Sequence, residues 1–245
     1  MTKLTKKKNE VAFTNEYDTD CASSSDILIP KILLMQGQSE MVLAGEAAFA
    51  EYRDSVTKEK LGDTKSPVQI LPFYMFKTWV VSKKEGERWT FHAIEDYDPK
   101  HIHEWTEVRD GEHFKYEETI NFYCFTRKKP DDEVGGIIST LPIVVSFKST
   151  SKRAGQTIYT QMYVINKAKR LLPFNTWFDL KSVKESKNGN TYAKSAVSVS
   201  QRSVTPFEIE QCQQWFSIVK QNTGFQVDSG EHSASSKPDV SDVSF

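Results

Sequence analysis

The stretch Pro67–Ser82, PVQILPFYMFKTWVVS, decides the class of fold. More than half of its residues are β-branched or aromatic, and such side chains favour strands. It therefore predicts one long strand or two broken ones. The same style continues in Arg88–Ile94, Phe114–Arg127 and Gly135–Ser149, with Gly, Pro and Asp residues between them. The middle of the chain is predicted to be rich in strands, and strand counting alone allows a barrel, a bent sheet or a sandwich.

Two helices are predicted beside these strands. Apolar residues recur at helical spacing in Gln156–Leu172, which indicates an amphipathic helix. Its apolar side is expected to hold Ile158, Met162, Ile165, Ala168 and Leu172. The second helix has clearer ends, because Thr205 is a suitable N-cap, Pro206 suits the first helical position and Glu208 completes a capping box. Its buried side is expected to hold Phe207, Cys212, Trp215, Phe216 and Val219, with Gly224 just past its end.

Residues 177–200 predict a β-hairpin that follows the first helix. Its turn is expected at Asn188-Gly189, a pair that readily adopts positive φ. Side chains alternate between the two faces of a strand, so Trp177 and Phe178 should point in opposite directions. We expect Phe178 to face the core and Trp177 to face a binding groove.

The polar ends of the chain define the expected domain organisation. Residues 1–26 are polar and serine-rich and are expected to form a disordered arm. A single domain should span residues 27–225, and residues 226–245 should form a disordered acidic tail. No apolar run reaches the roughly 18 residues of a membrane-spanning helix. The three cysteines are far apart, which favours free thiols in a reducing compartment and hence a cytoplasmic protein.

The formal net charge of −1 conceals a division within the chain. Residues 85–125 contain eleven acidic and four basic residues. Residues 148–202 contain eleven basic residues against Asp179 and Glu185. A concentrated basic field attracts polyanions whatever the total charge, although the two regions can also neutralise each other within the fold.

Catalytic and metal-binding motifs are hard to find in this sequence. His101 and His103 lie two residues apart, but no Cys-x-x-Cys or His-Glu-x-x-His pattern accompanies them, so we interpret them as surface histidines. No phosphate-binding glycine loop and no nucleophile motif follows a predicted strand. The carboxylates of residues 85–118 are interpreted as a solvated acidic face. We therefore expect a protein that is not an enzyme and needs no metal or cofactor.

Aromatic side chains run through the basic segment, and this mixture favours binding of single-stranded nucleic acid. Cations follow the phosphates while flat rings stack on unpaired bases, at about 1–3 kcal/mol per base. In the alternative interpretation, Phe174 and Trp177 belong to the core and the lysines only fringe a solvated hairpin. The candidate binding residues are Lys148, Lys152, Arg153, Tyr159, Tyr163, Lys167, Arg170, Trp177, Lys181, Lys184, Lys187, Tyr192 and Lys194.

The last residues, KPDVSDVSF, place Asp239, Asp242 and Phe245 at the end of the polar tail. A terminal aromatic ring and its carboxylate can be captured by a pocket on a partner protein. Here the sequence resembles bacterial and bacteriophage single-stranded DNA-binding proteins, whose disordered acidic tails end in Phe. The stretches IPKILLMQGQSEMV (29–42), PVQILPF (67–73) and PIVVSFKSTS (142–151) are also similar to phage proteins of this class.

The resemblance implies a mostly β fold with two helices, arranged as an oligonucleotide-binding-type barrel or a strongly bent antiparallel sheet. It implies largely sequence-independent binding of single-stranded DNA in phage replication or recombination, in the host cell cytoplasm. The tail would recruit replication or recombination proteins. Two other functions stay open: a structural or regulatory protein that binds proteins through its charged faces, and a Mg²⁺-dependent nuclease or recombination enzyme that uses the carboxylate-rich stretch.

Overall fold

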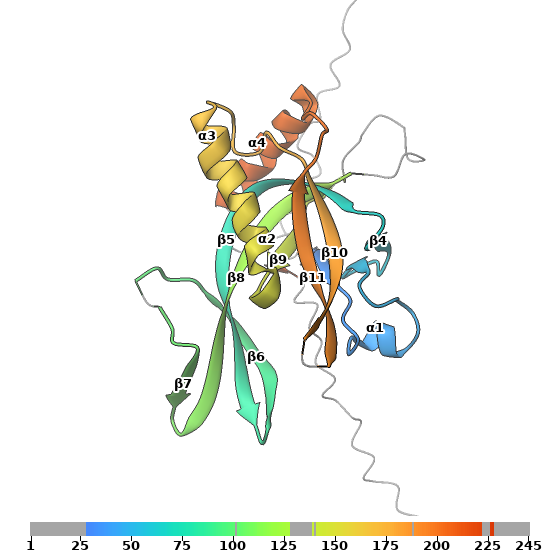
Figure 1. Ribbon diagram of the computed structural model, residues 1–245. Helices are drawn as coiled ribbons and strands as arrows, with labels where there is room; N and C mark the ends of the chain where they lie inside the picture. The colour runs from blue at the N-terminus through green and yellow to red at the C-terminus, as the bar shows by residue number, and fades with distance from the viewer. Residues whose placement is uncertain are drawn as a thin grey trace, which may run out of the picture.

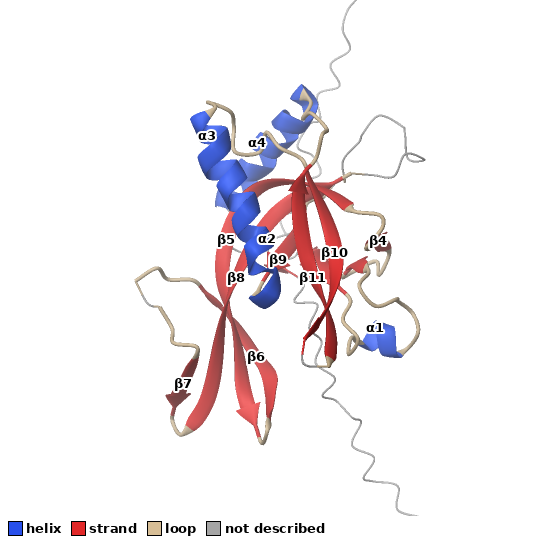
Figure 2. Cartoon of the chain, viewed as in Figure 1, coloured by secondary structure: helices blue, strands red, loops and turns tan. Residues whose placement is uncertain are grey.

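The computed structural model describes residues 28–100, 102–127, 139, 141–187, 189–221 and 226–227. Within these residues, ten strands form one sheet with helices packed against it (Figures 1 and 2). The strands lie in the order β11-β10-β5-β8-β9-β2-β3-β4, while β6 pairs with β5 and β7 pairs with β8. The expected class, mostly β with helices, is confirmed.

The strands are β1 (Leu28–Ile29), β2 (Lys31–Leu34), β3 (Tyr52–Asp54), β4 (Lys60–Gly62), β5 (Val68–Glu85), β6 (Arg88–Asp96), β7 (Thr106–Arg109), β8 (Glu112–Thr126), β9 (Ile143–Phe147), β10 (Phe178–Lys187), β11 (Asn190–Val199) and β12 (Gln226–Val227). The helical segments are α1 (Glu40–Leu43), η3 (Ser149–Ser151), α2 (Lys152–Tyr159), η4 (Thr160–Ile165), α3 (Asn166–Ala168) and α4 (Pro206–Gln221).

The sheet is open. Within the described part of the chain, its two end strands β11 and β4 do not pair with each other, so no closed barrel is formed. Strands β2 and β9 run parallel, with Ile32 opposite Val145. The expected antiparallel pairing therefore holds for the other described strand pairs of this sheet but not for β2 and β9, and the sheet is mixed.

The stretch that decided the fold class forms one strand, β5, of 18 residues. It pairs with β8 along most of its length, and the register shifts between Pro72 and Tyr74. Pro72 has no N–H to donate to the ladder, which explains an irregularity at this point. Beyond the body of the protein, β5 and β8 continue as a projection with β6 and β7 at its edges (Figure 2). We call this projection, residues 78–119, the arm.

Outside the arm, the sheet is buried on both faces. On one face, Ile158 and Met162 of the α2–η4 helix pack over a cluster that includes Phe122 and Phe178. On the other face, Cys212 and Val219 of α4 pack over Phe73 and Tyr123, together with Trp177. Neighbouring residues of one strand thus enter different cores, because successive side chains of a strand point to opposite faces.

The predicted start of α4 is confirmed. The backbone N–H of Glu208 donates to the Thr205 hydroxyl at 3.3 Å, and the N–H of Thr205 donates to the Glu208 carboxylate at 2.9 Å. This reciprocal pair is the capping box that the sequence predicted. The predicted burial of Phe207 is wrong, since its side chain is 52% exposed. Cys212 and Val219 are buried as predicted, and α4 also buries Glu208.

The amphipathic helix lies where it was predicted, but only some of the side chains predicted to be buried are buried. Ile158 and Met162 are buried, whereas Ile165 and Leu172 are exposed. The cause is the π-helical segment η4, which has more residues per turn than an α-helix. The next buried position is therefore Asn166, whose amide donates to the Pro173 carbonyl at 3.0 Å.

The hairpin is confirmed, and its register opposes Lys187 to Asn190 across the two-residue turn. Gly189 adopts positive φ, as a turn of this kind requires. The expectation that Trp177 faces a groove is wrong. Its side chain is fully buried, its indole N–H donates to the Glu208 carboxylate at 3.2 Å, and the Arg202 guanidinium lies 4.5 Å from its ring. The predicted alternation holds, but α4 covers the face that was expected to be open.

The two ends of the described chain lie side by side. Gln226 and Val227 form β12, which pairs in parallel with Leu28 and Ile29 of β1. The predicted start of the tail at residue 226 is therefore wrong, because these two residues belong to a strand. Asp239, Asp242, Phe245 and the N-terminal residues 1–26 lie outside the described residues. None of the described helices is long and apolar enough to cross a membrane.

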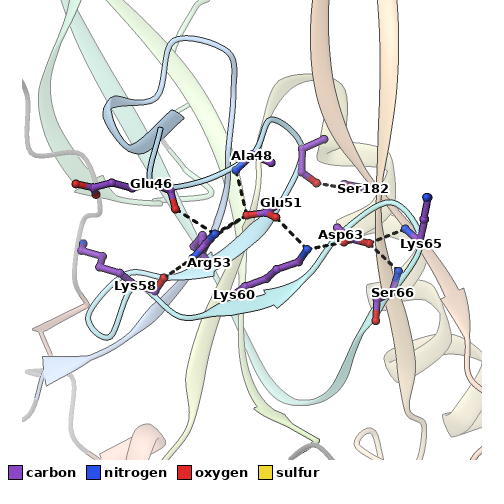
Figure 3. Close-up of polar contacts among 11 residues, drawn as sticks. Glu46, Ala48, Glu51, Arg53, Lys58, Lys60, Asp63, Lys65, Ser66 and Ser182 are labelled. Carbon is purple, nitrogen blue, oxygen red and sulfur yellow. Dashed lines mark hydrogen bonds and ion pairs between the residues drawn. The ribbon is translucent and has the colours of Figure 1, made fainter. Parts of the chain in front are cut away.

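A network of ion pairs holds β3 and β4 together (Figure 3). The buried carboxylate of Glu51 contacts Arg53 at 2.6 Å and Lys60 at 2.9 Å, and Lys60 also contacts Asp63 at 2.7 Å. The adjacent Ala50 carbonyl accepts a hydrogen bond from the Ser182 hydroxyl at 2.6 Å. The network is thereby linked to the hairpin of β10 and β11.

Replacing Trp177 with Ala tests its place in the core. The change leaves a large cavity and removes a hydrogen bond from buried Glu208, so we expect the free energy of unfolding to fall by about 3–5 kcal/mol. Phe207→Ala, at an exposed position of α4, is the control and should change it by no more than about 0.5 kcal/mol. Urea unfolding followed by circular dichroism measures both. A Trp177→Ala protein as stable as the control would contradict the burial of this ring.

Replacing Glu51 with Gln tests the ion-pair network. Burial alone would raise the pKa of Glu51, but hydrogen bonds from Lys60 and Arg53 outweigh it and hold the pKa below its usual value. The stability that such a group contributes is present above its unfolded pKa of about 4.3 and is lost as the pH falls through the folded value. Glu51→Gln should therefore lower the free energy of unfolding by about 1–3 kcal/mol at neutral pH.

The loss caused by Glu51→Gln should shrink in acid, where the wild-type carboxylate is protonated as well. Urea unfolding at pH 7 and at about pH 3 measures this difference. Glu46→Gln makes the same chemical change on an exposed side chain and is the control. An equal loss at both pH values would show that Glu51 does not stabilise the fold through its charge.

Candidate functional site

A groove of about 980 Å³ opens between the base of the arm and the hairpin. Figure 1 shows that the arm and the hairpin extend from the same side of the body. Val80 and Thr119 line the groove from the arm, and Ala193 and Ser195 line it from the hairpin. The remaining lining residues are Lys31, Ile32, Leu33, Leu34, Met35, Gln36, Gln38, Ser39, Glu40, Met41, Ala44, Glu46, Tyr52, Lys58, Val145, Ser146, Lys148, Ser149, Thr150 and Ser151.

The lining of the groove combines cations, hydroxyl groups and apolar side chains. Three lysines (Lys31, Lys58 and Lys148) stand against two glutamates, Glu40 and Glu46. Five serines, two threonines and one tyrosine supply hydroxyl groups. Lysine and hydroxyl side chains are typical partners of phosphate oxygens. The groove can therefore hold an anionic ligand that also presents apolar or aromatic surface.

Side-chain hydrogen bonds hold the walls of the groove to strand β11. The amide of Gln36 donates to the Ala193 carbonyl at 2.9 Å and accepts from the Ala193 N–H at 3.0 Å. The Tyr52 hydroxyl donates to Ser195 Oγ at 2.9 Å, and burial raises the pKa of Tyr52. The Ser195 N–H donates to Ser151 Oγ at 2.9 Å. The groove thus has its shape fixed by the fold itself.

The ion-pair network of β3 and β4 supports the outer wall. The guanidinium of Arg53, held by Glu51, donates to the carbonyls of Lys58 at 3.0 Å and Glu46 at 3.3 Å (Figure 3). Both of these residues line the groove. Arg53 therefore positions a part of the wall that carries a lysine.

The structure disperses the binding residues that the sequence predicted. Among the described residues that line the groove, Lys148 is the one member of the predicted set. Lys152 lies on α2 and binds Glu118 at 2.5 Å, and Glu118 also binds Lys77 at 2.6 Å. The other predicted residues of this helical segment are Arg153, Tyr159, Tyr163, Lys167 and Arg170.

The two predicted tyrosines of the helical segment lie together. The rings of Tyr159 and Tyr163 are 5.2 Å apart, and Tyr159 is exposed. Burial raises the pKa of Tyr163 to about 12. This pair lies outside the lining of the groove. Tyr163 packs against the core, so the exposed ring of the pair is that of Tyr159.

The predicted basic residues of the hairpin do not share one face. Lys181, Lys187, Tyr192 and Lys194 lie on the side opposite buried Leu180, as the strand register shows. Lys184 lies on the other side, with its ammonium 5.1 Å from the ring of Phe49. Lys184 follows Lys181 by three positions, and an odd offset along a strand places two side chains on opposite faces.

One carboxylate neutralises part of this outer face. Glu185 accepts a hydrogen bond from the Tyr192 hydroxyl at 2.8 Å and forms an ion pair with Lys194. These contacts lower the pKa of Glu185, with the hydrogen bond from Lys194 as the largest cause. Lys194 was predicted to bind nucleic acid, whereas in the structure it pairs with Glu185 of the same hairpin.

Sequence reasoning missed Lys31, Gln36 and Lys58. Lys31 and Gln36 lie within IPKILLMQGQSEMV, one of the stretches that carried the resemblance, so a signal for this segment was present. No pattern marked Lys58, which reaches the groove through the loop between β3 and β4. The groove is assembled from separate segments, and charge density along the sequence does not reveal such a site.

Several carboxylates of the arm form ion pairs. Glu107 pairs with Arg109 at 3.2 Å, and Glu112 pairs with Lys83 at 2.6 Å. His103 is not the surface histidine that was expected, because its side chain is only 6% exposed and stacks on Tyr116 with a centroid distance of 4.0 Å. His101 lies outside the described residues. No group of three or more His, Cys, Asp or Glu side chains in the described part of the chain is placed to hold a metal ion.

Comparison with known proteins gives a family but no characterised relative. No curated protein and no solved structure matches the chain. One family model, described as "Pam3 phage gp34-like protein", matches residues 5–222 and so includes the groove, the arm and the hairpin. Because this match spans well over half of the sequence, the chain belongs to the family of Pam3 phage gp34-like proteins.

Proposed function

We propose that this protein binds single-stranded DNA in the groove between the arm and the hairpin, without strong sequence preference and without catalysing a reaction. One observation carries the proposal: a single groove combines three lysines with hydroxyl and apolar side chains in its lining. The lysines would contact phosphates, which fixes the strand without reading its sequence. Membership of a phage family supports a phage protein, and the resemblance of the sequence to phage single-stranded DNA-binding proteins suggests a role in replication or recombination in the host cell cytoplasm.

The composition of the groove favours a single strand over a duplex. Leu33, Leu34 and Met41 belong to its lining, are partly exposed and provide apolar surface beside the lysines. The base faces of a duplex are already stacked on one another, whereas an unpaired base has a free face to place on such a surface. Two of the three stretches that carried the resemblance, residues 29–42 and 142–151, supply much of this lining.

The finer parts of the proposal concern the tail and the type of fold. Asp239, Asp242 and Phe245 would be captured by a replication or recombination protein, through the terminal carboxylate and ring. The curved, open sheet would be a variant of the oligonucleotide-binding architecture with helices on both faces. Both statements rest on the resemblance, and neither is needed for binding in the groove.

The double variant Lys31→Gln, Lys148→Gln tests the groove. Each phosphate contact with a single strand contributes about −0.7 to the slope of log affinity against log salt. Two lost contacts should weaken binding at moderate salt and flatten the slope by about 1.4. Fluorescence anisotropy with a labelled oligo-dT, over a series of NaCl concentrations, measures both quantities.

Two matched variants locate the effect. Lys220→Gln, in the last turn of α4, removes a cation that does not line the groove and should leave affinity and slope unchanged. Lys181→Gln with Lys187→Gln removes two cations from the outer face of the hairpin. A larger effect from this hairpin pair than from the groove pair would move the binding surface to the hairpin.

The same titration separates the other functions. Wild-type protein that binds no oligonucleotide at low salt would contradict the proposal and favour a structural or regulatory protein that binds proteins. Cleavage of the oligonucleotide when Mg²⁺ is added would favour the nuclease. Binding that weakens steeply with salt, with the oligonucleotide intact in Mg²⁺, is the result expected here.

A further inference from the structure

The arm is a two-sided sheet, and the chain covers one of its sides. Trp79, Val81 and Tyr116 point to the same side and are buried there. Tyr97 and His103, which lie between β6 and β7, cover them: Tyr97 stacks on Trp79 at 5.5 Å, and His103 stacks on Tyr116 at 4.0 Å. We call this side the covered face of the arm.

The opposite side, which we call the open face, carries large apolar side chains that remain exposed. The register places Trp89 beside Lys84, and Ile94 beside Val80, on this side. Trp89 is 41% exposed, Ile94 is 47% exposed and Val108 is 62% exposed. Exposed apolar groups that gather on one face mark a binding surface more often than scattered ones do.

The charges of the arm divide unequally between its two faces. Glu95, Glu107, Glu112 and Glu118 all lie on the covered face, in register with its buried residues. Three of these four carboxylates are paired with Lys or Arg side chains. Those acidic residues of 85–118 that the strand register assigns to a face therefore lie mainly on the covered face.

The open face carries cations among its aromatic rings. Lys84 is exposed beside Trp89, and the ammonium of Lys115 lies 4.4 Å from the ring of Trp105. Two carboxylates, Asp96 and Glu117, also lie on this face, and Glu117 accepts a hydrogen bond from the Ser149 hydroxyl. Rings interleaved with ammonium groups suit a polymer that alternates bases with phosphates.

The open face is continuous with the groove. Val80 and Thr119 belong to this face by register, and both of them line the groove. Phe91 and Trp89 follow along β6 toward the tip of the arm. A strand that leaves the groove on this side meets the open face next.

We propose that the open face of the arm is a second contact surface for single-stranded DNA, on which bases stack against Trp89 and Phe91 while Lys84 and Lys115 contact phosphates. This inference rests on the proposed function and extends it from the groove to the arm. A second copy of the chain is the competing occupant of an exposed apolar face. The cations among the rings and the continuity with the groove favour the nucleic acid.

The variant Trp89→Ala tests the inference with oligo-dT of increasing length. The shortest oligonucleotides that bind should occupy the groove alone, so the variant should bind them as the wild type does. Longer oligonucleotides should reach the arm, and the variant should bind them about fivefold or more weakly. Trp89→Phe keeps a ring and should recover most of the affinity.

Phe207→Ala is the matched control, because it removes an exposed ring from α4, outside the groove and the arm. It should bind oligonucleotides of every length as the wild type does. Trp89 is partly exposed, so Trp89→Ala should keep the melting temperature and the circular dichroism spectrum of the wild type. The Lys31→Gln, Lys148→Gln variant should weaken binding at every length, which separates the groove from the arm.

Each contrary outcome has its own meaning. Equal affinity of wild type and Trp89→Ala at all lengths would overturn the arm contact and leave the proposed function standing. Absence of binding by the wild type would overturn both. In analytical ultracentrifugation, a wild-type dimer that Trp89→Ala dissociates, with oligonucleotide binding unchanged, would assign the open face to a second copy and overturn the inference.

Discussion

The pairing of β5 with β8 is the constraint on which the rest of the structure depends. The pairing begins where Ile70 lies opposite Thr126 and ends where Lys83 lies opposite Phe114. The same two strands therefore form part of both the body and the arm. In the body both faces of this pair are buried, by α2 and η4 on one side and by α4 on the other. In the arm only one face is buried. The groove lies where this change occurs, at Val80 and Thr119.

Local chemistry made several parts of the fold predictable from the sequence. The capping box of Thr205 and Glu208, the turn at Gly189 and the long strand of Pro67–Ser82 depend on neighbouring residues, and all three are present. Burial was less predictable, because it depends on what packs from a distance. Trp177 is buried since α4 returns over it, and the π-helical segment moves the inward position from Ile165 to Asn166.

The candidate site was predicted only in part, and for a related reason. The sequence identified a basic, aromatic segment and included Lys148, which lines the groove. The sequence analysis counted the charges of a whole segment together. In a strand, however, successive side chains point to two different faces. Lys181 and Lys184 separate in this way, and so do the carboxylates and rings of the arm. Lys31 and Lys58 approach Lys148 only through the pairing of β2 with β3 and with β9.

Protection of lysines from chemical acetylation, with and without excess oligo-dT, tests the central claim most directly. It maps a bound strand onto the intact protein by mass spectrometry, and it needs no variant. If the strand lies in the groove, Lys31, Lys58 and Lys148 should react more slowly when the oligonucleotide is bound, while Lys181, Lys187 and Lys220 keep their rates. Protection confined to the hairpin and α4 lysines, or protection of none, would contradict the account.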